Sequence, residues 1–378
     1  MNRILTTHVG SLPRPADLLD LMKAKLSGLA YDKVAYDQRV NSAVAECVRK
    51  QVETGIDIVS DGEQSKPGFF SYVRERLEGF EARPGQKRKL FPAEVAAFPE
   101  YYEKYFREAM MGGAVAPVVP LVCTGPVKYR GAEALKRDID NLKAAAGGAR
   151  GAFMPAVAPS GVGTNEHYRT EEEFFHAVGA ALHAEYQAIV AAGLLLQVDD
   201  PFLSDIFADS DLDAAQRNKR AAMYVEAINA SLAGIPPEKV RFHTCYGINE
   251  GPRIHEAALS DVVGYMLKVN AGAYSFEAAN PRHEHEYHLW ESVRLPEGKV
   301  LIPGVITHAS NIVEHPVLIA ERLVRFAKLV GRENVVAGAD CGFSSQASYH
   351  TEVHPTVVWA KFEAMREGAE LATKQLWS

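Results

Sequence analysis

Eight short apolar runs recur along this sequence, and a longer segment with helical spacing follows each of them. The runs lie at residues 3–11, 56–63, 152–160, 194–201, 241–247, 273–280, 300–308 and 334–342. They are too apolar to alternate cleanly between polar and apolar positions, which is typical of parallel strands buried on both faces. Eight strand–helix units predict an α/β fold, the TIM (β/α)8 barrel. A doubly wound sheet is the alternative, but no GxGxxG motif follows the first run.

Glycine residues mark the ends of three predicted helices. Apolar residues with helical spacing cover 40–52, 182–190 and 318–330, and these stripes stop before Gly55, Gly193 and Gly331. A glycine after the last apolar position is the left-handed stop signal of a helix that leads into a strand. The sequence therefore predicts that each of these helices feeds the next strand of the barrel.

The chain has 378 residues, and its surplus length lies mainly between the second and third predicted strands. Residues 76–130 hold a basic patch at 85–91 (GQKRKLF), an aromatic-rich helix candidate at 98–106 (FPEYYEKYF) and a further apolar strand at 117–125 (PVVPLVCTG). No Ser/Gly linker sets this segment apart. We therefore expect one catalytic barrel domain over 1–378, with 76–130 as an insertion over the barrel mouth.

Charge and cysteine content narrow the range of partners. A net charge of -7 argues against nucleic acid or an anionic membrane as the partner. No stretch approaches the roughly 20 apolar residues of a transmembrane helix, and the start, MNRILTTHVGS, does not resemble a secretory signal. The 4 cysteines are too few for a disulfide scaffold and too scattered for a CxxC module. We expect a cytoplasmic protein that binds small molecules, and the sequence leaves a homo-oligomer open.

Metal-binding side chains stand at the ends of three predicted strands. His243 and Cys245, in RFHTCYG, share one face of a strand because side chains at i and i+2 point the same way. Glu277 and Cys341 lie at the ends of the sixth and eighth strands, and these ends converge at one face of a barrel. One imidazole, two thiols and one carboxylate suit tetrahedral zinc. The alternative is a metal-free barrel with the thiols as small core side chains.

A series of ordered motifs covers nearly the whole chain: TTHVGSLPRP, DIVSDGE, LLLQVDDP, FHTCYG, FEAANPRHEHE, IPGVITHASN and GADCG. Together they resemble the catalytic barrel of cobalamin-independent methionine synthase, and still more its short single-barrel relatives, which include the epoxyalkane:coenzyme M transferases. The resemblance implies a zinc-dependent enzyme that alkylates a small thiol with an alkyl donor. It also implies the zinc ligands His243, Cys245, Glu277 and Cys341.

The matched motifs imply roles for further residues. Ser11 resembles the residue that holds the carboxylate of an amino-acid thiol, and Glu63 and Asp199 resemble the acids that hold its ammonium group. His308 resembles the proton donor to the leaving group, a role that its near-neutral pKa suits. The other candidates are His8 and Asp200 for substrate binding, Arg282 as an anchor for an anionic substrate end, and Asp199 or Asp200 as the alternative proton donor.

Three functions stay open at this point. The first is methyl transfer to homocysteine or a related thiol, and the second is thiol addition to an epoxide with coenzyme M. The third is a metal-free barrel, either a lyase of the uroporphyrinogen decarboxylase type or a ligand-binding protein. Methionine synthase carries a folate-stacking tryptophan after its third barrel strand, whereas the corresponding stretch here, APSGVGTNEHY, has none. The sequence therefore does not identify the alkyl donor.

Overall fold

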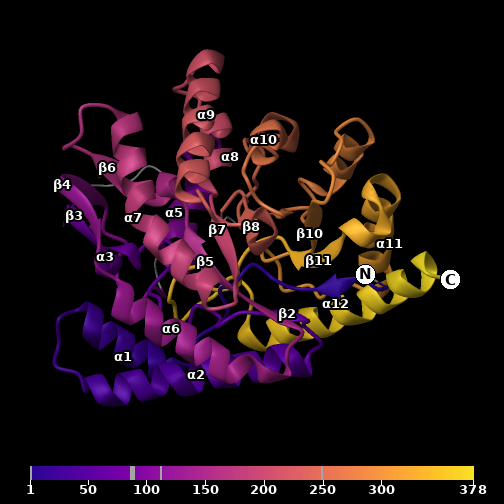
Figure 1. Ribbon diagram of the computed structural model, residues 1–378, viewed down its shortest axis with the longest axis horizontal. Coiled ribbons are helices and arrows are strands. Elements are labelled where there is room, and N and C mark those ends of the chain that lie inside the picture. The colour runs from indigo at the N-terminus through magenta and orange to yellow at the C-terminus, as the bar shows by residue number, and fades with distance from the viewer. Residues whose placement is uncertain (1, 86–89, 111–112, 248–249) are drawn as a thin grey trace.

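The computed structural model describes residues 2–85, 90–110, 113–247 and 250–378. At its centre is a barrel of eight parallel strands (Figure 1). The strands are β1 (Leu5–Thr6), β2 (Ile58–Val59), β5 (Gly151–Val157), β7 (Leu195–Asp199), β8 (Val240–His243), β9 (Ala273–Phe276), β10 (Val300–Ile306) and β11 (Val336–Ala339). β1 pairs with β11, and a parallel bridge between Thr7 and Ile58 closes the ring. Each predicted run overlaps one of these strands, so the predicted TIM barrel is confirmed.

The helices surround this barrel, in the order in which the chain returns from one strand to the next (Figure 1). They are α1 (Ala16–Leu26), α2 (Lys33–Glu53), α3 (Val73–Arg76), α6 (Ala132–Ala145), α7 (Glu171–Ala191), α8 (Phe202–Ala208), α9 (Ala214–Ser231), α10 (Leu259–Met266), α11 (Pro316–Val330) and α12 (Pro355–Leu376). The three predicted glycine stops have positive φ angles, 86° at Gly55 and Gly193 and 94° at Gly331. Within the described part of the chain, no helix is long and apolar enough to cross a membrane.

One unit departs from the expected strand–helix pattern. After β9 the chain forms a 3-10 helix, Glu284–Glu291, in place of an α-helix. Trp290 is the one buried residue of these eight, so the segment lacks the apolar stripe that would hold an α-helix against the barrel. Its polar side chains instead make ion pairs with neighbouring loops, as described below.

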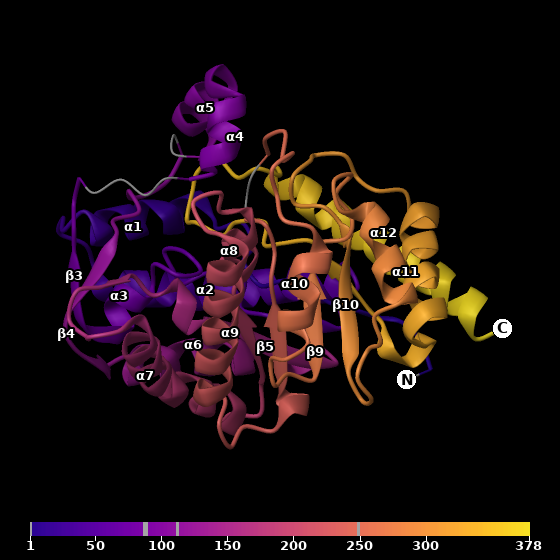
Figure 2. The ribbon, with the colours of Figure 1, turned by 90° about the horizontal axis from the view of Figure 1, so that it is seen from above.

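The insertion adds a small sheet and two short helices. β3 (Leu77–Ala82) and β4 (Leu121–Tyr129) pair antiparallel, and β4 pairs with β6 (Thr164–Asn165) from the loop after β5. Between β3 and β4 lie α4 (Pro92–Ala97), α5 (Pro99–Tyr105) and a π-helical turn (Phe106–Met110). Figure 2 shows α4 and α5 together at one edge of the molecule. Of the predicted basic patch at 85–91, residues 86–89 lie outside the described residues.

The two helices of the insertion rest on the loop that follows β8. His255 N donates to Glu94 Oε1 at 2.6 Å, and Tyr101 Oη donates to Glu250 O at 3.0 Å. Because this loop leaves the carboxyl end of a barrel strand, the contacts hold α4 and α5 near the end where barrel active sites are built. The division into one catalytic domain with an insertion over its mouth stays a prediction.

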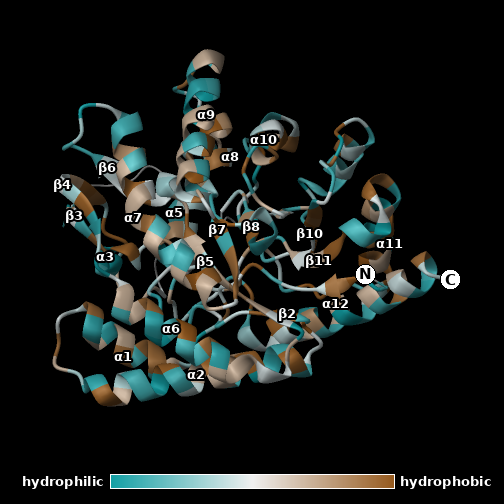
Figure 3. Ribbon diagram, in the orientation of Figure 1, coloured by the Kyte–Doolittle hydropathy of each residue, from teal (hydrophilic) through white to brown (hydrophobic). Residues whose placement is uncertain are grey.

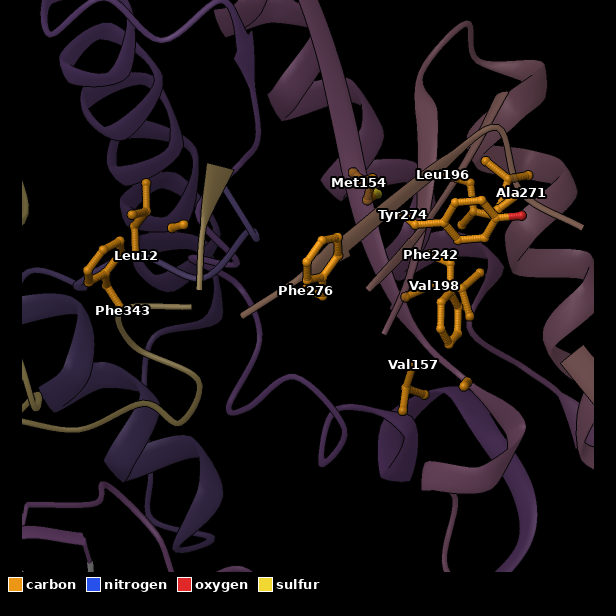
Figure 4. Packing of buried hydrophobic residues seen from close by; sticks show 14 of the residues in the cluster. Leu12, Met154, Val157, Leu196, Val198, Phe242, Ala271, Tyr274, Phe276 and Phe343 are labelled. Carbon is orange, nitrogen blue, oxygen red and sulfur yellow. The ribbon is translucent and has the colours of Figure 1, made fainter. Parts of the chain in front are cut away.

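Apolar side chains fill the space between the strands and the helices. Hydrophilic and hydrophobic residues alternate along α2 and α9, as expected for helices with one face on the barrel (Figure 3). Phe242 of β8 and Tyr274 of β9 are buried in this core (Figure 4). Arg241 and His243 lie on the other face of β8, where Arg241 donates to Thr7 Oγ1 at 2.9 Å inside the barrel. The strand therefore directs His243 into the barrel.

Candidate metal centre and active site

Three of the predicted metal ligands come together at the carboxyl end of the barrel. His243 ends β8, Cys245 follows it by two residues, and Cys341 follows β11. Their donor atoms all lie within 4.8 Å of one another, and the two Sγ atoms are 3.3 Å apart. All three residues are buried. The barrel topology thus brings together side chains that are about a hundred positions apart in the chain, 96 between the two cysteines.

The imidazole of His243 is oriented with one nitrogen available. Its Nδ1 makes a 3.0 Å hydrogen bond with Ser275 Oγ, whereas its Nε2 is buried and has no hydrogen-bond partner among the described residues. Burial lowers the pKa of His243 to about 3, so the ring is neutral. A neutral ring that is fixed through one nitrogen and free at the other is the usual state of a metal-binding histidine.

The thiols of Cys245 and Cys341 lie against each other in a buried site. The hydrogen bond to Cys341, together with burial, raises the pKa of Cys245 well above its ordinary value. Two neighbouring buried thiols cannot both ionise unless a cation joins them. Zinc favours thiolate and imidazole donors, and it would supply this positive charge. The chemistry of this three-donor set therefore fits a zinc ion.

Glu277, the predicted fourth ligand, has other partners. Arg253 Nη2 donates to both of its carboxylate oxygens, at 2.9 Å and 3.2 Å. A ligand atom of Glu277 lies within 4.8 Å of those of His308 and Asp340, which form a second group of potential donors. The negative charge of Glu277 nevertheless contributes to the raised pKa of Cys245. The structure thus places Glu277 near the thiols but keeps its carboxylate engaged with an arginine.

His308 and Asp340 are further polar side chains on this side of the site. Asp340 Oδ1 accepts hydrogen bonds of 2.8 Å from the two main-chain N–H groups that follow Glu277. Asp340 Oδ2 and His308 Nδ1 are both buried and unpaired within the described ranges. Burial and the charge of Arg253 lower the pKa of His308 to about 4. Its Nε2 lies 3.2 Å from the carbonyl of Gly247, which can only accept, so Nδ1 is free to take a proton.

A second set of unpaired polar atoms belongs to β7 and the loop after β2. Gln197 Nε2 donates to Asp199 Oδ1 at 2.8 Å. Gln197 Oε1 and Glu63 Oε2 are buried acceptors that receive no hydrogen bond from any described residue. Burial and the charge of Glu63 raise the pKa of Asp199 well above its ordinary range. Two close carboxyl groups and a spare amide oxygen are complementary to a small cationic group such as an ammonium.

The side chain of Ser11 lies close to the loop that carries Cys341. A Cβ atom on Gly342 would lie 2.0 Å from Ser11 Oγ, so the hydroxyl group occupies the space that a side chain at position 342 would need. A Cβ atom on Gly10 would lie 3.2 Å from Glu63 Oε1. Ser11 Oγ therefore lies beside the residue that follows Cys341, and the residue before Ser11 lies close to the carboxylate of Glu63.

The remaining predicted site residues differ in whether their polar atoms are already hydrogen-bonded within the protein. His8 has both ring nitrogens occupied, because a main-chain N–H donates to Nδ1 at 3.2 Å and Nε2 lies 2.7 Å from Gln51 Oε1. Asp200 accepts a hydrogen bond of 2.8 Å from Ser160 at Oδ1, and its Oδ2 is unpaired among the residues described. Arg282 is exposed. The substrate-binding roles of all three stay predictions, and His8 in this arrangement has no nitrogen left for a ligand.

The sequence-based prediction missed several polar residues of the site, among them Asp340, Gln197 and Arg253. Gln197 lies two positions before Asp199 on β7, so the i, i+2 rule that joined His243 and Cys245 also points to it. Arg253 lies in the loop after β8, 24 residues before Glu277. No periodic pattern connects these two loops, so their ion pair becomes visible only in the fold.

Comparison with known families identifies the barrel. The sequence model of the family described as "Cobalamin-independent synthase, Catalytic domain" matches residues 4–88 and 159–366. The chain belongs to this family. The resemblance read from the motifs is thereby confirmed, and the unmatched stretch between the two ranges contains most of the insertion.

Several proteins named methionine synthase are similar to this chain. The protein named methionine synthase from Sulfolobus acidocaldarius is 25% identical over 246 residues, which are 64% of this chain and 61% of that protein. The methionine synthase of Saccharolobus solfataricus is 22% identical over 384 residues, covering 98% of this chain and 95% of that protein. A B12-independent methionine synthase from Shewanella sp. W3-18-1, solved with selenomethionine, has a TM-score of 0.71, with 20% identity and 99% of each chain covered. This last likeness supports the fold.

Proposed function

We propose that this synthase domain is a zinc-dependent methyltransferase that acts on homocysteine or a closely related amino-acid thiol. Two groups of buried, unpaired atoms carry the proposal. One is His243 Nε2 beside the two thiols, and the other comprises Glu63 Oε2 and Gln197 Oε1, all without partners in the described part of the chain. An amino-acid thiol has a sulfur for the first group and an ammonium for the second.

Each polar residue has a task in this proposal. Zinc held by His243, Cys245 and Cys341 would make a substrate thiol available as a thiolate near neutral pH. Ser11 would bind the carboxylate of the same substrate between the two groups. His308 would accept a proton at its free Nδ1 and return it to the leaving group of the methyl donor.

The identity of the methyl donor is outside the proposal. The three tryptophans lie in the 3-10 helix after β9 (Trp290), on α12 (Trp359) and directly after α12 (Trp377), so the loop after β5 offers none for stacking on a folate ring. All four cysteines are free, which supports a reducing, cytoplasmic environment.

The experiment is metal analysis followed by a thiol alkylation assay. We expect about one zinc per chain and methylated homocysteine as the product with at least one methyl donor. Cys341→Ser should lose both zinc and activity, whereas Cys47→Ser should keep both, because Cys47 is buried on α2 among the core residues. Zinc-loaded protein that alkylates coenzyme M with an epoxide and leaves homocysteine unchanged would overturn the assignment, and so would protein that takes up no zinc.

A further inference from the structure

Arg253 is a buried residue that binds Glu277 with its side chain and is itself held by neighbouring loops. Its Nη2 contacts both oxygens of Glu277, and its Nε donates to Glu256 Oε1 at 2.6 Å. Its carbonyl oxygen accepts a hydrogen bond of 3.2 Å from Arg282 Nε. Its φ angle is 59°, a left-handed conformation that is costly for any residue with a side chain. The surrounding contacts therefore fix this arginine against a backbone preference.

The ion pair between Arg253 and Glu277 is one end of a longer row of side chains with alternating charge. Glu256 Oε2 lies 2.9 Å from His283 Nε2, and His283 Nδ1 lies 2.8 Å from Glu286 Oε2. Because both ring nitrogens face carboxylates, both must donate, and His283 is an imidazolium. The row Glu277–Arg253–Glu256–His283–Glu286 thus contains three carboxylates and two cations. With Glu277 included, the row carries one excess negative charge. Without Glu277, the charges of the four remaining side chains balance.

Arg253 also has an N–H group that its ion pairs with Glu277 and Glu256 do not use. Its Nη1 is buried and has no partner in the described ranges, and the same holds for Asp340 Oδ2. Asp340 and Glu277 offer ligand atoms within 4.8 Å of each other. When Glu277 moves away, Arg253 therefore keeps Glu256 and has a second unpaired carboxylate oxygen nearby.

We propose that Arg253 is a positioning residue that competes with the metal for Glu277. In the metal-free protein Arg253 binds the carboxylate of Glu277. When the metal binds, the carboxylate leaves Arg253 and becomes the fourth zinc ligand. Arg253 thereby sets the zinc affinity of the site. This inference rests on the proposed function, since it requires zinc at His243, Cys245 and Cys341.

The test is a measurement of zinc affinity by chelator competition on metal-free protein. Arg253→Met removes the competing cation, so this variant should bind zinc about 10- to 100-fold more tightly than the wild type, the range of one charge-assisted hydrogen-bonded pair. In a Glu277→Gln background there is no carboxylate to compete for. There, Arg253→Met should change the affinity less than about twofold, which is the sign of a direct coupling.

A second variant should change the zinc affinity in the opposite direction, and it leaves Arg253 in place. Glu256→Gln removes the other carboxylate partner of Arg253 and leaves the arginine to Glu277 alone. This variant should bind zinc at least about threefold more weakly than the wild type. Arg76→Met is the matched control, because Arg76 is a buried arginine that pairs with Asp138 and Glu185 in another part of the structure. It should lower stability but leave the zinc affinity unchanged.

The outcomes separate this inference from the proposed function. Unchanged or weaker zinc binding by Arg253→Met, or an equal shift in both Glu277 backgrounds, would overturn the inference while wild-type zinc binding upholds the site. If Arg253→Met does not fold, an increase in zinc affinity for Glu256→Gln overturns the inference in the same way, and a decrease supports it. Wild-type protein that never binds zinc would instead refute the proposed function.

Discussion

Replacement of Gly304 by alanine should displace Asp340 and so disturb the side of the site that also contains Glu277 and His308. A Cβ atom on Gly304 of β10 would lie 2.0 Å from Asp340 Oδ1 and 2.7 Å from both the main-chain N and the Cα of Asp340. Rotation of the aspartate cannot relieve the two contacts with its backbone. Gly304→Ala must therefore push β10 and β11 apart where Gly304 pairs with Gly338.

The size of the effect follows from what Asp340 holds. Its Oδ1 accepts two main-chain hydrogen bonds of 2.8 Å from the residues after Glu277. Each hydrogen bond to a charged group contributes about 1.5–3 kcal/mol. We therefore expect Gly304→Ala to lower the free energy of unfolding by about 3–6 kcal/mol and to weaken zinc binding as the strand ends move.

Urea denaturation of the metal-free protein, followed by circular dichroism, measures this loss. Gly264→Ala is the control, because Gly264 is an exposed residue of α10 with nothing within 4 Å of an added Cβ. This variant should gain about 0.5–1 kcal/mol through better helix propensity. A Gly304→Ala protein as stable as the wild type would refute the close approach of β10 to Asp340.

Three further predictions concern single side chains. Cys341→Ser should reduce the zinc content from about one per chain to near zero while circular dichroism shows an intact fold; full zinc retention would exclude Cys341 as a ligand. His308→Ala should bind thiol normally but turn over about 100- to 10,000-fold more slowly, and equal turnover would move the proton transfer to Asp199 or Asp200. Although burial acts against it, the carboxylates around His283 raise its pKa to about 9. Its contribution to stability, roughly 3 kcal/mol, should be complete below pH 6.5 and lost as the pH rises through 9, so the difference between wild type and His283→Asn in urea denaturation should shrink over this range; a constant difference would contradict the charged row.

The barrel could be predicted because its signal is local and repeated. Each buried strand reads as an apolar run, and each of three helices ends at a glycine that the structure shows with positive φ. The exception is the segment after β9, where a helix was expected but the sequence offers few apolar residues for one. The 3-10 helix there is held by its neighbours rather than by its own periodicity.

The site could be predicted in part, for the same reason. His243, Cys245 and Cys341 stand at strand ends, so the barrel topology alone brings them together. The engagement of Glu277 by Arg253 could not be predicted, because it joins two irregular loops. Nor could the sequence indicate that His8 spends both ring nitrogens on protein partners.

We propose that His243, Cys245 and Cys341 hold a metal to which the substrate sulfur binds. Cobalt in place of zinc tests this most directly, since sulfur-to-cobalt charge-transfer absorption reports the number of sulfur ligands. Addition of homocysteine should intensify this absorption and release protons near neutral pH, because a bound thiol must lose its proton. A protein that methylates homocysteine with no change in the cobalt spectrum would contradict the claim, since the metal would then be structural.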